Sequence, residues 1–201
     1  MRVKKQELLA RKPPVWPIDL LPTIRARVER AGVKIVVLDD DPTGTQTVHD
    51  VPVLNDWSIA ALEAVMVEPG HVFYVTTNTR SLTLAQAQHI NRQIALRLKA
   101  AREATGRDFV IISRGDSTLR GHYPAEIEAL VEALDRPFDG AIIAPFFLEG
   151  GRLTVDDVHY VTEEEWLIPA AETEYARDAA VGYKYSNLRA WVAEKHGGGI
   201  A

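Results

Sequence analysis

The chain has 201 residues, of which 46% are hydrophobic and 25% are charged, so it is long enough to bury one good-sized core. Its net charge of −5 excludes a general nucleic-acid surface, which needs a clustered basic face. The absence of cysteine excludes disulfides, iron–sulfur clusters and cysteine-ligated zinc. No apolar run reaches the ~20 residues of a membrane span, and Pro13, Pro14 and Pro17 interrupt the N-terminus. We therefore expect a soluble cytoplasmic protein that binds neither nucleic acid nor a membrane.

Short apolar runs rich in β-branched residues alternate with helical patterns along the chain. The runs cover residues 33–38, 72–75, 109–112 and 141–144 and are typical of buried strands. The first helical pattern ends at Gly32, and a later one begins at Thr83, where Gln86 completes a capping box. Other helical patterns cover residues 57–66 and the stretch that Pro124 opens. The alternation predicts an α/β fold: a mainly parallel open sheet with helices on both faces, in a Rossmann-like three-layer arrangement.

The pattern weakens after Arg152. The charge run at residues 163–165 suggests the solvated start of a helix, and Ser186 is the expected cap of a short helix that carries Trp191. The chain stops at Gly-Gly-Gly-Ile-Ala, which suggests a linker or loop leading into a segment that is absent. We therefore expect a truncated chain.

Each predicted strand is followed by a polar loop, and ligands of open α/β sheets bind at the carboxyl ends of the strands. These loops cover residues 39–46, 76–81, 114–122 and 145–152. The third, R-G-D-S-T-L-R-G-H, holds one carboxylate, two hydroxyls and two guanidiniums between glycines. Guanidiniums bind carboxylates or phosphates, and carboxylates accept hydrogen bonds from hydroxyls. The loops therefore predict a site for a small, anionic, polyhydroxylated ligand.

The first loop also permits a different chemistry. Residues 36–43 fit h-h-h-D-x-D-x-T, the nucleophile motif of haloacid-dehalogenase-like phosphatases, with Asp39 as nucleophile and Asp41 as acid/base around magnesium. That mechanism also requires a lysine on a later loop, and the lysines after Lys34 follow no predicted strand. The six histidines show no metal-ligand spacing, so we predict no metal site in this chain.

The loops together resemble the N-terminal, sugar-binding domain of the four-carbon acid sugar kinases, a family long treated as of unknown function. That family carries D-D-x-T-G after its first strand, as this sequence does at residues 40–44, and D-S-T-L-R-G, matched without change at residues 116–121. Pro145, Gly151 and Arg152, followed by His159-Tyr160-Val161, echo its later motifs. The resemblance implies a sugar-acid-binding α/β domain at 31–201. The preceding residues 1–30 form an expected N-terminal extension with a helix, which departs from the family pattern.

The resemblance further implies ATP-dependent phosphorylation of a threonate- or erythronate-like acid. ATP and Mg²⁺ would bind a C-terminal domain that this chain lacks, so we expect the chain alone to be inactive. Asp116 would accept the proton of the attacking hydroxyl. The substrate-binding residues would be Asp40, Asp41, Thr43, Arg80, Arg114, Ser117, Thr118, Arg120, Gly121 and Arg152.

Arg80 and Arg120 would clamp the carboxylate of the acid, and its hydroxyls would be bound by Asp40, Asp41 and Asp116. Either Arg114 or Arg152 would face the transferred phosphate. The expected partners are the sugar acid and either a C-terminal kinase domain or further copies of the chain. The alternative from another class is a sugar-acid-binding module, or a truncated relic, with no chemistry of its own.

Overall fold

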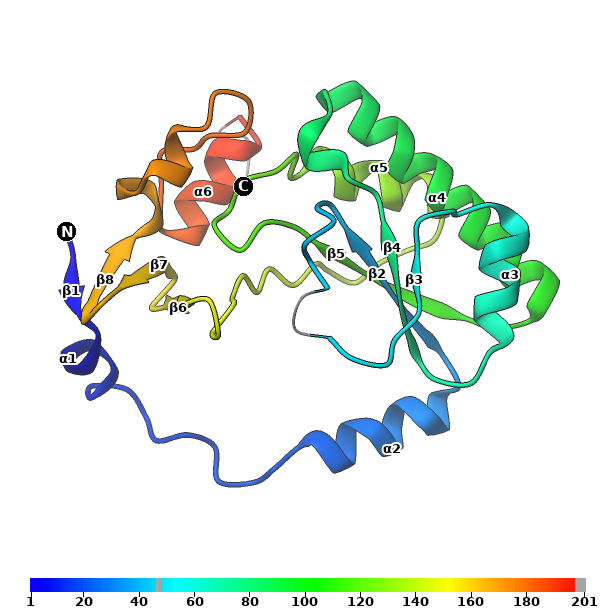
Figure 1. The fold of residues 1–201 in the computed structure, drawn as a ribbon, viewed down its shortest axis with the longest axis horizontal. Helices are drawn as coiled ribbons and strands as arrows, with labels where there is room; N and C mark the ends of the chain where they lie inside the picture. Colours follow the sequence, from blue (N-terminus) through cyan, green and yellow to red (C-terminus); the bar gives the residue numbers. More distant parts are fainter. Residues whose placement is uncertain (46–47, 198–201) are drawn as a thin grey trace. The chain divides into compact units, whose positions relative to one another are not determined.

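The structure, a computed structural model, describes residues 1–45 and 48–197. The chain divides into two compact units (Figure 1). Unit 1 consists of Met1–Val15, Asp116–Pro124 and Asp139–Ala201, and unit 2 of Trp16–Gly115 and Ala125–Phe138. The division at residue 30 that the sequence suggests stays a prediction. No helix in the described part of the chain is both long enough and apolar enough to cross a membrane.

Unit 2 is built on a four-stranded parallel sheet, in agreement with the alternating sequence pattern. Its strands, in spatial order, are β3 (Val53–Leu54), β4 (Val72–Thr76), β2 (Lys34–Asp39) and β5 (Phe109–Arg114). All three neighbouring pairs are parallel. The register pairs Asp39 with Thr76 on one side and with Arg114 on the other. The polar residues that follow these strands therefore start from one edge of the sheet.

Four helices and one 3-10 turn complete unit 2: α2 (Leu21–Ala31), α3 (Ile59–Val67), η1 (Thr79–Ser81), α4 (Leu84–Thr105) and α5 (Ala125–Leu134). Local sequence explains several of their ends. Thr83 and Gln86 form the expected capping box at the start of α4, and Gly32 ends α2 with a left-handed φ of 63°. Figure 1 shows α4 and α5 running beside each other along the sheet.

The core of unit 2 lies on one face of its sheet. Alternate strand residues, among them Val36, Phe73 and Phe109, are buried against side chains of α3, α4 and α5. On the other face Val110 and Ile112 are 46% and 49% exposed. Helix α2, in which four of eleven residues are charged, has no buried residue. The described helices thus form one buried layer, where the alternating pattern predicts two.

Unit 1 contains a small antiparallel sheet that the sequence pattern does not predict. Its strands, in spatial order, are β1 (Val3–Lys4), β8 (Trp166–Pro169), β7 (Val158–Glu163) and β6 (Arg152–Val155). The short elements around it are α1 (Lys5–Leu9), η2 (Ala170–Glu172), η3 (Glu174–Arg177) and α6 (Leu188–Lys195). A second core cluster, which includes Leu119, Tyr183 and Trp191, lies in this unit.

Three local expectations differ from the structure, and the first two concern residues 141–144 and 163–165. Residues 141–144 form no strand, and Ile142 is 95% exposed. The run is only four residues long between a glycine and a proline, and the chain just after it is tied to β6, where Phe147 bridges to Arg152. Glu163 ends β7, and Glu164 and Glu165 form the turn to β8 instead of a helix start.

The cap of α6 is also different from the expected one. Asn187 caps the helix by accepting hydrogen bonds from two backbone N–H groups, whereas Ser186 Oγ accepts one from the Ala171 N–H at 2.8 Å. An asparagine side chain is as good an N-cap as serine, so two adjacent capping residues leave the choice to tertiary contacts. Residues Gln46 and 198–201, on which part of the first loop and the linker interpretation rest, lie outside the described residues.

Candidate functional site

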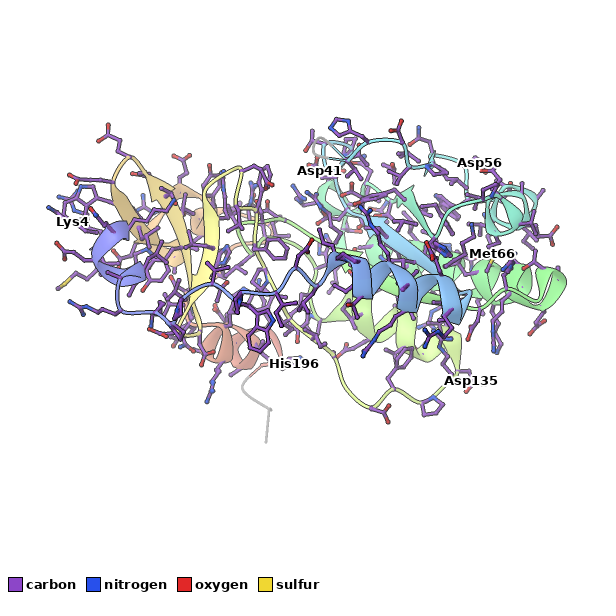
Figure 2. All side chains as sticks on the ribbon, turned by 90° about the horizontal axis from the view of Figure 1, so that it is seen from below. Lys4, Asp41, Asp56, Met66, Asp135 and His196 are labelled. Atoms are coloured by element: carbon purple, nitrogen blue, oxygen red, sulfur yellow. The ribbon has the colours of Figure 1, made fainter. Side chains whose placement is uncertain are left out.

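A group of acidic and basic side chains, here named the strand-end cluster, lies at the carboxyl edge of the parallel sheet in unit 2. Its members are Asp39, Asp40, Asp41, Thr43, Arg80 and Arg114. They come from the ends of β2 and β5 and from η1, which follows β4. Figure 2 shows Asp41 and Asp135 on opposite sides of unit 2; Asp41 follows the carboxyl end of β2, and Asp135 follows helix α5.

Arg80 holds two of the three adjacent aspartates. Its Nε and Nη2 atoms donate to the two carboxylate oxygens of Asp40 at 3.1 and 2.5 Å, and its Nη1 donates to Asp41 Oδ2 at 3.0 Å. The Arg80 backbone N–H also donates to the Asp40 carbonyl. A two-point guanidinium–carboxylate pair fixes both orientation and distance. The repulsion expected among adjacent carboxylates is thereby relieved.

Asp39 is the most deeply buried carboxylate of the strand-end cluster, at 1% exposure. Arg114 Nη1 donates to its Oδ1 at 3.2 Å. Burial raises the pKa of the Asp39 carboxyl above its ordinary value, and the charge of Arg114 offsets only part of this rise. Gly44 passes so close that a Cβ placed there would lie 1.9 Å from Asp39 Oδ2. Glycine at position 44 is therefore required by this close approach.

Asp41 behaves in the opposite way. Its Oδ1 accepts hydrogen bonds from the Thr43 backbone N–H at 2.8 Å and from the Thr43 hydroxyl at 2.5 Å. Burial pushes the pKa of Asp41 upward, but these bonds and the charges of Arg80 and Arg114 outweigh it, so the pKa lies below its ordinary value. Asp41 is thus held as a carboxylate.

A buried network supports η1, the turn that carries Arg80, and sequence reasoning missed it. Glu126 on α5 accepts hydrogen bonds from the Thr79 hydroxyl at 2.5 Å and from Asn91 Nδ2 at 3.0 Å. Thr77, whose hydroxyl lies 3.1 Å from that of Thr79, also bonds the Asp39 carbonyl. The position of Glu126 could have indicated a buried hydrogen-bonding role, because this residue shares the buried face of α5 with Ala129 and Leu130.

The second cluster, here named the loop cluster, lies in unit 1 and contains residues 116–121 with Arg152 and Tyr175. Asp116 Oδ2 accepts a hydrogen bond from Arg120 Nε at 2.6 Å and another from the Thr118 hydroxyl. The side chain of Asp116 is 8% exposed and that of Arg120 is 26% exposed. A largely buried carboxylate is therefore held beside a more accessible guanidinium.

Tyr175 on η3 brings the two arginines of the loop cluster together. The guanidinium carbons of Arg120 and Arg152 lie 5.1 and 5.7 Å from the centre of its ring. Arg152 Nη2 donates to the Tyr175 hydroxyl at 3.2 Å, and its buried Nε has no hydrogen-bond partner among the described residues. Two cations on one aromatic ring form a site that suits an anion. The sequence motifs identified both arginines as candidate binding residues, but they did not identify Tyr175.

The structure thus assembles the expected residues in two groups, each within its own unit. Asp40, Asp41, Thr43, Arg80 and Arg114 belong to the strand-end cluster. Asp116, Ser117, Thr118, Arg120, Gly121 and Arg152 belong to unit 1. The prediction that loops 39–46 and 76–81 meet at one sheet edge is confirmed for the described residues. The grouping of residues 116–121 with them stays a prediction. Within the described residues, no three His, Asp or Glu side chains are arranged to hold a metal ion.

Comparison with known proteins gives a family match over most of the chain. The sugar-binding N-terminal domain family matches residues 35–201. The chain is 31% identical to a D-threonate kinase of Bordetella bronchiseptica over 165 residues, which are 78% of this chain and 38% of that protein. It is 28% identical to a D-erythronate kinase of Heliobacterium modesticaldum over 148 residues, or 72% of this chain and 32% of that protein. The chain thus spans about a third of the length of these relatives.

Two solved structures have a similar fold. A protein of the domain family DUF1537 from Bordetella bronchiseptica, solved with bound citrate as a domain-swapped dimer, has a TM-score of 0.58 and 29% identity. The match covers 79% of this chain and 39% of that one. A Haemophilus influenzae protein of the same family has a TM-score of 0.52 and 16% identity, covering 80% and 38% of the two chains. The second match concerns the fold alone.

Proposed function

The chain belongs to the sugar-binding N-terminal domain family, and from this premise we propose that it is the part of a four-carbon acid sugar kinase that binds the acid. Its matched relatives include a D-threonate kinase and a D-erythronate kinase. The substrate class we propose is therefore an acid of the threonate or erythronate type. Because this chain spans about a third of those proteins, kinase activity is proposed for the whole protein and acid binding for this part.

The observation that carries the proposal is the arrangement around Asp116. A largely buried carboxylate lies beside Arg120, and Tyr175 places Arg152 near the same guanidinium. A sugar acid offers both groups that this arrangement recognises, since its carboxylate pairs with a guanidinium and its hydroxyls donate to an aspartate. The bound citrate of a relative, itself a small hydroxylated acid, supports an anion site in this family.

Each side chain then has a definite task. Arg120 pairs with the carboxylate of the acid, and Asp116 accepts the proton of the attacking hydroxyl as general base. Arg152, whose guanidinium shares the Tyr175 ring with that of Arg120, faces the phosphoryl group that is transferred. Ser117, Thr118 and Gly121 belong to the same loop and supply its short polar groups around the ligand. Catalysis of phosphoryl transfer consists mainly of positioning and electrostatic stabilisation, and holding the acid in one orientation supplies the first of these.

The sequence contains no Walker-type phosphate loop, and no three His, Asp or Glu side chains of the described residues are grouped to hold a metal ion. We propose that ATP and Mg²⁺ bind another part of the kinase, and the steps assigned above involve only this chain's side chains and the acid.

The phosphatase alternative requires Asp39 to attack a phosphate. Asp39 is 1% exposed, is paired with Arg114, and has Gly44 against its carboxylate. A nucleophile must be reached by its substrate, so these contacts favour a structural Asp39 and the kinase assignment.

Calorimetric titration of the 201-residue chain tests the proposal. D-Threonate and D-erythronate should bind, whereas threitol and erythritol, in which a CH2OH group replaces the carboxylate, should bind at least about tenfold more weakly. The reason is that a charge-assisted hydrogen bond contributes ~1.5–3 kcal/mol. Equal affinity for acids and polyols would contradict a carboxylate clamp. The absence of binding by all four compounds would contradict the assignment of acid binding to this part of the protein.

A further inference from the structure

Two consecutive peptide carbonyls in the loop at residues 116–121 each accept a hydrogen bond from a buried aromatic side chain. His159 Nε2 lies 2.7 Å from the Ser117 carbonyl oxygen. The Tyr183 hydroxyl lies 2.6 Å from the Thr118 carbonyl oxygen. His159 has no exposed surface, and Tyr183 is 6% exposed, so water does not compete for either bond. Two successive peptide planes of the loop are therefore held from outside it.

The chemistry of the two donors is well defined. A carbonyl oxygen only accepts, so His159 must carry a proton on Nε2. Its Nδ1 lies 2.9 Å from the Thr154 hydroxyl, whose Oγ1 also lies 2.9 Å from the Pro145 carbonyl oxygen. Burial lowers the pKa of His159 and raises that of the Tyr183 phenol. At neutral pH the histidine is thus a neutral ring and the tyrosine a protonated hydroxyl.

Fixing these carbonyls also fixes the N–H groups of the same peptides. In a trans peptide the N–H points opposite to the C=O. Because the Ser117 carbonyl is directed to His159, the Thr118 N–H is directed away from it. Because the Thr118 carbonyl is directed to Tyr183, the Leu119 N–H faces the other way, where it donates to the Asp116 carbonyl at 3.2 Å. The turn that carries Asp116 and Arg120 therefore depends on both aromatic donors.

The loop has a conformation that needs such support. Leu119 has a φ of 68°, in the left-handed region that residues with a side chain adopt uncommonly. Such a residue persists only where its surroundings determine the backbone. The Leu119 side chain is buried in the core cluster that includes Tyr183, while the Tyr183 hydroxyl holds the preceding carbonyl. Packing and hydrogen bonding thus act on the same turn.

We propose that His159 and Tyr183 are positioning residues for the loop cluster: they hold residues 116–121 in the form that binds the ligand, without touching it. The geometric part of this proposal stands on the two hydrogen bonds, and the ligand part rests on the proposed function. The competing explanation is that both side chains only fill the core of unit 1. Variants that remove a donor but keep the volume separate the two explanations.

Tyr183→Phe removes one hydroxyl and keeps the ring, and Tyr160→Phe, on the neighbouring strand β7, is the matched control. His159→Leu removes the Nε2 donor, while His159→Gln offers an amide N–H in its place. Amide hydrogen exchange over residues 116–121 is measured first, because it needs no ligand. We expect Tyr183→Phe and His159→Leu to speed exchange in this loop by about fivefold or more, since a net hydrogen bond corresponds to a factor of that order. Tyr160→Phe and His159→Gln should stay near wild type.

Affinity for D-threonate and D-erythronate is the second readout. Tyr183→Phe and His159→Leu should weaken binding by about fivefold, and His159→Gln should restore most of it. Wild-type loop exchange in Tyr183→Phe, even with a lower melting temperature, would overturn the proposal in favour of core packing. If His159→Leu does not fold, Tyr183→Phe and His159→Gln still decide. If the wild-type chain binds no acid, the proposed function fails, while loop exchange still decides whether these residues position the loop.

Discussion

The Arg80 guanidinium and the Asp40 carboxylate form a two-point ion pair, with Nε–Oδ2 and Nη2–Oδ1 distances of 3.1 and 2.5 Å. The third nitrogen of Arg80 holds Asp41. Every nitrogen of the Arg80 guanidinium thus donates to one of these two aspartates. The pairing therefore favours a division of labour in which Arg80 orients the two aspartates and Arg120 meets the ligand.

Replacing Asp40 by Asn tests the importance of this pair for the fold. The change keeps the shape of the side chain but leaves Arg80 without its two-point partner in a largely buried setting. We expect the free energy of unfolding to fall by about 2 kcal/mol, which is less than the ~3–5 kcal/mol of a fully buried pair, because part of Arg80 remains exposed. Urea unfolding measures it. Arg92→Gln, which breaks the surface pair with Glu132, should change little, and equal losses in both variants would contradict this account.

Gly44 gives a sharper steric test. A Cβ at position 44 would lie 1.9 Å from Asp39 Oδ2, so Gly44→Ala must displace the buried Asp39–Arg114 pair. A Cβ at Gly115, by contrast, would lie 3.7 Å from Asp40 Oδ2, which is ordinary contact. We expect Gly44→Ala to lower the free energy of unfolding by ~1–3 kcal/mol, as overpacking does, and Gly115→Ala to change it far less. Thermal unfolding of both variants checks the order, and the reverse order would mean that the first loop does not approach Asp39 as described.

His159 predicts a pH dependence of stability. Burial lowers its pKa below the ordinary value of 6.5 that it regains on unfolding, so below that value the unfolded chain binds the proton more readily. The contribution of His159 is therefore fully present above about pH 7.5 and is lost as the pH falls toward the lowered pKa. In urea unfolding from about pH 7.5 to about pH 5.5, His159→Gln should show a smaller decline in the free energy of unfolding than wild type. Parallel curves would show that His159 takes up its proton equally in both states.

Local sequence signals predicted much of unit 2. Thr83 and Gln86 cap α4, and Gly32 ends α2. These effects involve residues that are close in the sequence, so the sequence pattern predicts them. Parallel strand order then brings Asp39 next to Arg114, because register fixes which strand ends meet. These are the features that short-range chemistry and strand periodicity determine.

Long-range pairing explains what the sequence did not reveal. Val3 pairs with Leu167 in a two-residue strand, too short to show any periodicity, so the antiparallel sheet of unit 1 went unpredicted. The hydrogen bonds from His159 to Ser117 and from Glu126 to Thr79 likewise join residues that are distant in the chain. Nothing in the local sequence around a histidine or glutamate identifies the distant group that it will bond.

Comparing Arg120→Ala with Asp39→Asn tests whether the loop cluster binds a sugar acid through Arg120. Because the Arg120–carboxylate interaction is charge-assisted and contributes ~1.5–3 kcal/mol, Arg120→Ala should weaken binding of D-threonate or D-erythronate by about tenfold or more. Arg120→Lys, which keeps the charge without the planar fork, should recover only part of that loss. Asp39→Asn should have a much smaller effect, because Asp39 is bound to Arg114 and is not assigned to the ligand. Calorimetry of the four proteins, with a phosphate-release assay alongside, gives the answer. An affinity unchanged in Arg120→Ala, or phosphate release that depends on Asp39 with no acid bound, would contradict the account.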